Sequence, residues 1–158
     1  MAGSQHDILI TIDAAYEEYV APGDLERVAR TALEAEGVPS AELGILITDD
    51  ATVHDLNRRY ADEDKATDVL SFSLREGEEF VSPDDTERLG EVIISLDTAK
   101  RQAEEAGRAL EAEVAHLLVH GILHLLGYDH AEPDEERAMQ ARERELLAGT
   151  GVEHLLDH

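Results

Sequence analysis

Apolar residues recur along the chain at two different periods, which predicts short strands alternating with helices. Aliphatic or β-branched runs typical of strands occur at 7–12, 43–48, 67–72 and 89–95. Longer segments with helical spacing follow most of these runs. The interleaved order predicts an α+β or α/β sandwich that forms one domain over residues 1–158. We expect the first strand to be buried on both faces, because its apolar residues do not alternate cleanly.

Helix ends are marked by acidic capping residues, glycine and proline. The expected N-caps, in chain order, are Asp24, Asp49 or Asp50, and Asp97. Gly107 should end the helix that Asp97 begins. A long apolar helix is expected from about Ala109 to Leu126. Pro133 should open a last helix, whose inward-facing residues are predicted to be Ala138, Met139, Leu146 and Leu147.

The composition limits the cell compartment and the kind of site. Cysteine is absent, which excludes disulfides and thiolate metal sites and fits a reducing environment. No apolar run is long enough to span a membrane, so we expect a soluble protein of the cytoplasm. The acidic segment 75–88 is predicted to be a long loop, which either carries solvated charge or covers a cleft.

The net charge argues against nucleic acid as a partner. Asp and Glu number 37 against 13 Lys and Arg, which gives a formal charge of −24. A uniformly acidic protein repels a polyanion. RNA binding would therefore need the few cations, Arg58, Arg59, Lys65 and Arg101, to gather near one site.

Three histidines in HGILHLLGYDH, residues 120–130, carry the candidate chemistry. His120 and His124 are four residues apart, so on a helix they project from one face about one turn apart. Gly127 can take the positive φ that ends a helix and lets the chain bring His130 back toward the same point. Three neutral imidazoles leave one position of a zinc ion open for water. The spacing therefore predicts one Zn²⁺ per chain, bound by His120, His124 and His130.

An isolated histidine on an apolar helix is more often a packed core residue than a metal ligand. The combination favours metal, because the third histidine follows a glycine stop, as in the zinc-protease pattern HExxHxxGxxH. Gly121 stands where such a protease carries its general-base glutamate, so the peptidase base is missing. His116 lies one turn earlier on the same face and is expected either to support the ligands from behind or simply to pack.

The histidine block resembles the motif HGxLHLxGYDH of the YbeY family, bacterial zinc-dependent endoribonucleases that act in ribosomal RNA maturation. The segment LNRRYADEDKATDVLSF at 56–72 is similar to the family's LNxxYRxxDxxTDVLSF, and LGEVIIS at 89–95 resembles its LGDIxIS strand. The three blocks come in the family's order, and the resemblance spans about residues 7–148.

The resemblance implies a mixed four-stranded sheet packed with about five helices, the metal-binding helix at the centre. It implies a single-strand-specific metallo-endoribonuclease, with zinc-activated water cleaving phosphodiester bonds in 16S rRNA 3′-end maturation and ribosome quality control. The implied partners are ribosomal or other single-stranded RNA and the small ribosomal subunit with its associated factors, with no DNA and no membrane. It also places Asp68 and Ser71 at the cleft, although Asp68 is equally explained as a turn or cap residue.

This chain departs from the family at one position. The family motif has a functional Arg directly after the Tyr, where this chain has Ala61. Arg59 is the candidate catalytic residue, with Arg58 as the alternative, because either could reach the same space from one turn earlier. Each of them alone is better explained as a solvated helix residue that offsets nearby acids.

Two other functions stay open at this point. A zinc metalloprotease has the same histidine spacing but needs the base that Gly121 replaces. A non-catalytic, zinc-stabilised module of the ribosome-maturation machinery would fit if Ala61 means that the catalytic Arg is lost.

Overall fold

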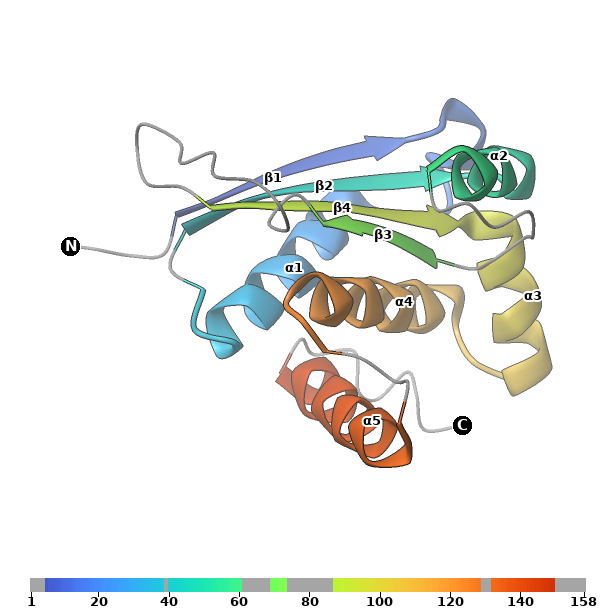
Figure 1. Cartoon of the computed structure of the whole chain (residues 1–158). Helices are drawn as coiled ribbons and strands as arrows, with labels where there is room; N and C mark the ends of the chain where they lie inside the picture. The colour runs from blue at the N-terminus through green and yellow to red at the C-terminus, as the bar shows by residue number, and fades with distance from the viewer. Residues whose placement is uncertain (1–4, 39, 61–68, 74–86, 129–131, 150–158) are drawn as a thin grey trace.

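In the computed structural model, which describes residues 5–38, 40–60, 69–73, 87–128 and 132–149, four strands form one mixed sheet (Figure 1). The strands are β1 (Gln5–Ile12), β2 (Ser40–Thr48), β3 (Val69–Ser73) and β4 (Glu87–Ser95). Their order across the sheet is β1-β2-β4-β3. Strands β1, β2 and β4 are mutually parallel, and β3 pairs antiparallel with β4 at the sheet edge.

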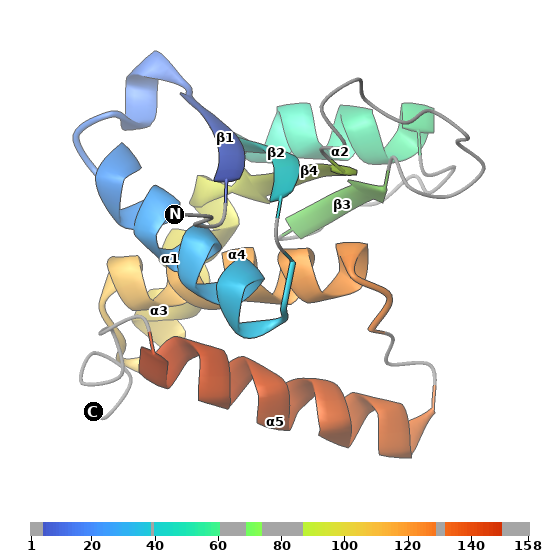
Figure 2. The ribbon, with the colours of Figure 1, turned by 90° about the vertical axis from the view of Figure 1, so that its left-hand side faces the viewer.

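The described residues also form five α-helices and a 3-10 helix, and the last three helices follow the final strand. They are η1 (Ala14–Tyr16), α1 (Pro22–Ala35), α2 (Asp50–Tyr60), α3 (Leu96–Ala106), α4 (Leu110–Leu125) and α5 (Pro133–Gly149). Helices α1 and α4 cover one face of the sheet, α5 packs outside them, and α2 lies on the opposite face (Figure 2). The predicted α+β fold with a mixed four-stranded sheet is confirmed. None of the described helices is long and apolar enough to cross a membrane.

Helix α4 is the centre of the packing. It contacts α1, α3, α5 and the two strands β3 and β4. Leu117, Leu118 and Val119 are all buried, and as consecutive residues they point to different sides of the helix. A helix that is apolar nearly all round must be enclosed by other elements. The central position expected for the histidine helix is therefore confirmed.

Strand β1 corrects one expectation. We predicted a strand buried on both faces, but β1 forms an edge of the sheet and pairs with β2. Ile8 and Ile10 pack against the core, whereas Leu9 between them is 73% exposed. A short β-branched run suits an edge strand as well as a central one, and α2 lies over β3 and β4 instead.

The predicted N-cap of α1 is also wrong. The helix begins at Pro22, with Ala21 as its N-cap, and Asp24 lies within the first turn. Proline fixes the φ angle that the first helical residue needs, so the helix starts before the capping side chain that we predicted. Asp49 is confirmed as a cap, because its Oδ1 accepts a hydrogen bond of 2.7 Å from the backbone N–H of Thr52.

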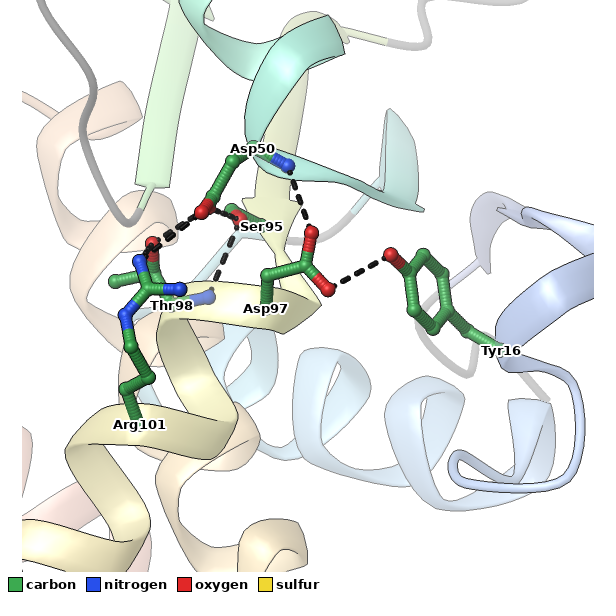
Figure 3. Close-up of polar contacts among 6 residues, drawn as sticks. All are labelled: Tyr16, Asp50, Ser95, Asp97, Thr98 and Arg101. Carbon is green, nitrogen blue, oxygen red and sulfur yellow. Dashed lines mark hydrogen bonds and ion pairs between the residues drawn. The ribbon is translucent and has the colours of Figure 1, made fainter.

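At the start of α3, Ser95 takes the capping role that we assigned to Asp97. The Ser95 hydroxyl accepts a hydrogen bond from the backbone N–H of Thr98 at 3.3 Å. Asp97 instead accepts hydrogen bonds from two other elements. One carboxylate oxygen accepts from the Tyr16 hydroxyl at 2.8 Å, and the other accepts from the backbone N–H of Asp50 at 3.2 Å (Figure 3). Asp97 thus ties the segment after β1 and the start of α2 to the start of α3.

Asp50 completes this polar cluster at the carboxyl ends of the parallel strands. Its Oδ1 accepts from the hydroxyls of Ser95 and Thr98, the latter at 2.7 Å. Its Oδ2 accepts from Nη2 of Arg101 at 3.0 Å (Figure 3). Burial alone would raise the pKa of Asp50, but these three hydrogen bonds outweigh it and lower the pKa. The cluster clamps α2 to α3.

Replacing Asp50 by Asn should lower the free energy of unfolding by roughly 1–2 kcal/mol, because the amide loses the charge and presents one acceptor atom instead of two. A depressed pKa stabilises the fold above the unfolded-state value of 3.8, and that contribution disappears as the pH falls below it. The difference between wild type and Asp50→Asn in urea unfolding should therefore shrink between about pH 6 and pH 3.

The matched control is Asp134→Asn, whose side chain is 92% exposed. It should change the unfolding free energy by no more than about 0.5 kcal/mol. A pH-independent difference for Asp50→Asn would contradict the clamp.

Candidate functional site

The candidate site is the polar stripe of the buried helix α4. His116, His120 and His124 stand on successive turns of one face. The rings of His120 and His124 are edge to face, with centroids 4.7 Å apart and planes at 78°. The side chains of His116 and His120 are 32% and 30% exposed, although the helix around them is buried. The stripe is therefore reachable from outside.

Helix α4 ends as the sequence predicted. Gly127 has a φ of 105°, a value that an L side chain rarely adopts. Its N–H donates to the carbonyl of His124 at 3.1 Å, and the N–H of Tyr128 donates to that of Leu123 at 3.0 Å. This pair of bonds is a Schellman motif, which stops the helix and turns the chain. His130 itself lies outside the described residues, so its place as the third ligand stays a prediction.

The turn is fastened to the rest of the molecule by Tyr128. Its hydroxyl donates to Oε1 of Glu36, just beyond the end of α1, at 3.0 Å. The other oxygen of Glu36 accepts from Nε of Arg142 on α5. Arg142 also donates to the carbonyl of Ala35 at 3.0 Å. Three helices thus fix the start of the segment that leads to His130.

Glu143 of α5 is the residue that the sequence analysis missed. Its carboxylate is 7% exposed and lies between two histidines of α4. Oε1 is 3.0 Å from Nε2 of His116, and Oε2 is 2.6 Å from Nδ1 of His120. Burial would raise the pKa of Glu143, but the two imidazoles outweigh it and lower the pKa to about 2. The carboxylate is therefore ionised and acts as an acceptor.

The spacing of α5 held a clue to Glu143. Met139, Leu146 and Leu147 are buried as predicted. Glu143 shares their stripe, since it lies four residues after Met139 and three before Leu146. Ala138, which we also expected to face inward, is exposed. A carboxylate on an apolar stripe indicates a buried partner, and that partner is the histidine face of α4.

His116 hydrogen-bonds Glu143, which in turn contacts His120. Its hydrogen bond to Glu143 raises the pKa of the imidazole, against the opposing effect of burial. Its Nδ1 atom is buried and has no hydrogen-bond partner among the described residues. The described contact of His116 with the site is therefore indirect, through Glu143, which lies between it and His120.

Gly121 brings α4 into close contact with the sheet. The hydroxyl of Ser71 donates to the carbonyl of Gly121 at 3.1 Å. A Cβ built on Gly121 would stand 2.7 Å from Cγ1 of Val92 and 3.1 Å from Oγ of Ser71. A side chain there would force Val92 or the helix to shift. The residue after the first histidine is thus small for a packing reason, and it faces the sheet.

The arginines named from the sequence lie on other elements. Arg58 and Arg59, near the end of α2, are 58% and 63% exposed, and both pair with Asp55 of the same helix. Helices α2 and α4 cover opposite faces of the sheet and run toward the same side of the molecule, with the edge strand β3 between them (Figure 2). Arg101 pairs with Asp50 in the polar cluster at the C-terminal end of β4. Ala61, Lys65 and Asp68 lie outside the described residues.

The donor set described here suits a metal ion but is incomplete. His120 and His124 offer two imidazoles one turn apart, which is the arrangement that zinc uses on a helix. In the described part of the chain, no group of three His, Cys, Asp or Glu side chains could hold a metal. The candidate site is two histidines with a hydrogen-bonded carboxylate, and the predicted third ligand, His130, follows the turn.

Comparison with known proteins identifies relatives over nearly the whole chain. A family model described as "Endoribonuclease YbeY" matches residues 9–151. The protein of that name from Thermobifida fusca is 48% identical over 150 residues, which cover 89% of this chain and 94% of the relative. The one from Pelotomaculum thermopropionicum is 48% identical over 126 residues, 79% and 83% of the two chains. The one from Roseiflexus sp. is 42% identical over 156 residues, 96% and 98%.

A solved structure shares the fold. The solution structure of TM1509 from Thermotoga maritima matches with a TM-score of 0.62, covering 93% of this chain and 91% of that one. The two sequences are 23% identical in that comparison, so the likeness concerns the fold alone.

Replacing Gly121 by Ala tests the close contact between α4 and the sheet. Alanine should gain about 1 kcal/mol of helix propensity, but overpacking against Val92 costs typically 1–3 kcal/mol. We expect a net loss of stability in urea unfolding. Gly23→Ala is the control, because nothing lies within 4 Å of its Cβ position.

The clash can be located with a second variant. In a Val92→Ala background the Gly121→Ala substitution should cost less, since the overlapping methyl groups are gone, and the two changes should be non-additive. Equal costs in both backgrounds would place the strain elsewhere.

Proposed function

Because this chain belongs to the YbeY family, we propose that it is a metallo-endoribonuclease that cleaves single-stranded RNA with one Zn²⁺ bound by His120, His124 and His130. The observation that carries the proposal is the pair His120 and His124, one turn apart on the accessible face of an otherwise buried helix. This pair lies inside the segment that the family model matches.

The chain's own residues account for how such a site is held. Glu143 fixes the ring of His120, and the turn at Gly127 directs the chain after α4. When bound, zinc would activate water and stabilise charge on the phosphoryl oxygen during cleavage. Gly121 stands where a zinc protease carries its general-base glutamate, and Glu143 is engaged by two imidazoles. Deprotonation of the water would therefore rest on the metal itself or on a base from elsewhere in the chain.

A metalloprotease fits this geometry less well. Its general base would follow the first ligand in the sequence, at the position of Gly121. That position is pressed against Val92 and Ser71 of the sheet, so a glutamate there would face the core. The packing thus supports a site without the peptidase base.

We further propose that the substrate is ribosomal RNA, with a role in 16S rRNA 3′-end maturation and ribosome quality control in the cytoplasm. The three sequence blocks shared with the family support this proposal. The small ribosomal subunit and its associated factors would be the partners. Contacts with the ribosome would also help a chain of net charge −24 to hold a polyanion.

Removing a ligand should abolish cleavage. His120→Ala and His124→Ala should each lose at least about 100-fold in the rate of cleaving a fluorescent single-stranded RNA, because even residues behind metal ligands contribute 10–100-fold. A chelator should remove the wild-type activity, and added Zn²⁺ should restore it. His54→Ala, on the opposite face of the sheet, is the matched control and should keep the wild-type rate.

Two results would contradict this proposal. Cleavage that survives in both ligand variants would point to a contaminating nuclease. Zinc binding by the wild type without any RNA cleavage would favour the non-catalytic module.

Arg59 remains our candidate for contact with RNA phosphate, because its guanidinium is 63% exposed at the end of α2. Arg59→Ala should weaken binding of single-stranded RNA and lower the slope of log affinity against log salt by about 0.7, the value for one phosphate contact. Arg27→Ala is the matched control, since it removes the same charge from an exposed position of α1 that also pairs with an acid of its own helix. Equal slopes for both variants would assign Arg59 to the solvated surface.

A further inference from the structure

We propose that Glu143 is a positioning residue of the metal site: it holds His120 in the tautomer that binds zinc through Nε2, and it uses His116 to hold its own carboxylate in place. The proposal rests on the proposed function in one respect, because it takes His120 to be a zinc ligand. It adds a residue from a different helix, which neither the histidine spacing nor the family motif named.

The contact with His120 fixes the tautomer. An ionised carboxylate can only accept hydrogen bonds. Oε2 of Glu143 lies 2.6 Å from Nδ1 of His120, so the proton of that imidazole must be on Nδ1. Nε2 then carries the lone pair, on the far side of the ring from Glu143. Histidine ligands of zinc commonly donate their other N–H to a carboxylate in this way, which fixes the ring and makes it more basic.

The contact with His116 fixes the carboxylate. Oε1 of Glu143 accepts from Nε2 of His116 at 3.0 Å, one helical turn before His120. Both oxygens are thus used, and the carboxylate plane is set by two points on one helix. The buried Nδ1 of His116 has no partner among the described residues, so the described polar contact of this ring is the one that Nε2 makes with Glu143.

A buried ion pair that only joins α5 to α4 is the competing explanation. Such a pair would be replaceable by apolar residues and would not depend on which nitrogen of His120 carries the proton. A positioning role predicts changes in zinc affinity and in the tautomer of His120. These two quantities separate the explanations.

The experiment compares Glu143→Ala, Glu143→Gln and a control in the full chain. Zinc affinity is measured by competition with a chromophoric chelator, and the His120 tautomer by nitrogen-15 NMR of the metal-free protein. Glu143→Ala should bind Zn²⁺ about 10- to 100-fold more weakly, because nothing orients His120. The same variant should lose the tautomer with the proton on Nδ1, which the wild type should show.

Glu143→Gln guards against a loss of folding. Its amide oxygen can still accept from Nδ1 of His120, while its NH₂ group faces His116, whose proton must move to Nδ1. Zinc affinity should therefore lie between that of the wild type and Glu143→Ala, with the His120 tautomer kept. Thermal melting followed by circular dichroism in the absence of metal reports whether each variant is folded.

Glu145→Gln is the matched control. It makes the same change of charge on the same helix, at a side chain that is 66% exposed and pairs only loosely with Arg142 at 3.7 Å. Its zinc affinity should stay within about twofold of the wild type. Its His120 tautomer should also be unchanged.

The outcomes distinguish this inference from the proposed function. Wild-type zinc affinity in a folded Glu143→Ala variant would overturn the positioning role and leave the nuclease proposal standing. A wild-type His120 with its proton on Nε2 would do the same. Loss of zinc affinity and tautomer in Glu143→Ala, in a protein that cuts no RNA, would support the positioning role and overturn the nuclease.

Discussion

The burial of α4 is the constraint on which the rest of the structure depends. The helix is apolar on nearly all sides, so it must be surrounded, and α1, α3, α5 and the sheet surround it. Beyond the first turn, which carries Glu111 and Glu113, the stripe of His116, His120 and His124 interrupts this apolar surface. The polar groups that could do chemistry are therefore carried by the most rigidly packed element, which suits a site that needs fixed ligand geometry.

Histidines on a buried helix cost free energy unless their ring nitrogens are hydrogen-bonded, and Glu143 accepts such a bond from two of them. A buried imidazole needs a hydrogen-bond partner, and a buried carboxylate costs several kcal/mol unless it is paired. Glu143 satisfies His116 and His120 together and is itself satisfied by both. On another face of the same helix, Gly121 has no side chain, so the sheet packs closely against the helix. The face toward the sheet is closed by packing, and the face toward α5 is ordered by hydrogen bonds.

Local signals in the sequence predicted the elements and placed two of the three predicted ligands, His120 and His124, on one helix. Gly127 ends α4 and Pro133 begins α5 because φ preferences act within a few residues. The failures concern contacts between distant residues. Whether β1 is buried on both faces depends on which strands α2 covers, and α2 contacts β3 and β4. Ser95 caps α3 because Asp97 binds Tyr16 and Asp50 instead. Glu143 was missed because its partners lie more than 20 residues away, on another helix.

The acidic composition is less of an obstacle to an RNA substrate than the total charge suggests. Several carboxylates serve the fold: Asp49 caps α2, Asp50 clamps α3, and Glu36 pairs with Arg142. Exposed charges further than about 8–10 Å from a point are largely screened at physiological salt, so the potential at the site depends on its nearest groups. At the site, the carboxylate of Glu143 is already engaged by two imidazoles, and near His116 the charge of Glu113 is offset by Arg108. A bound divalent cation would be the largest local charge and would make this part of an acidic protein attractive to a phosphate.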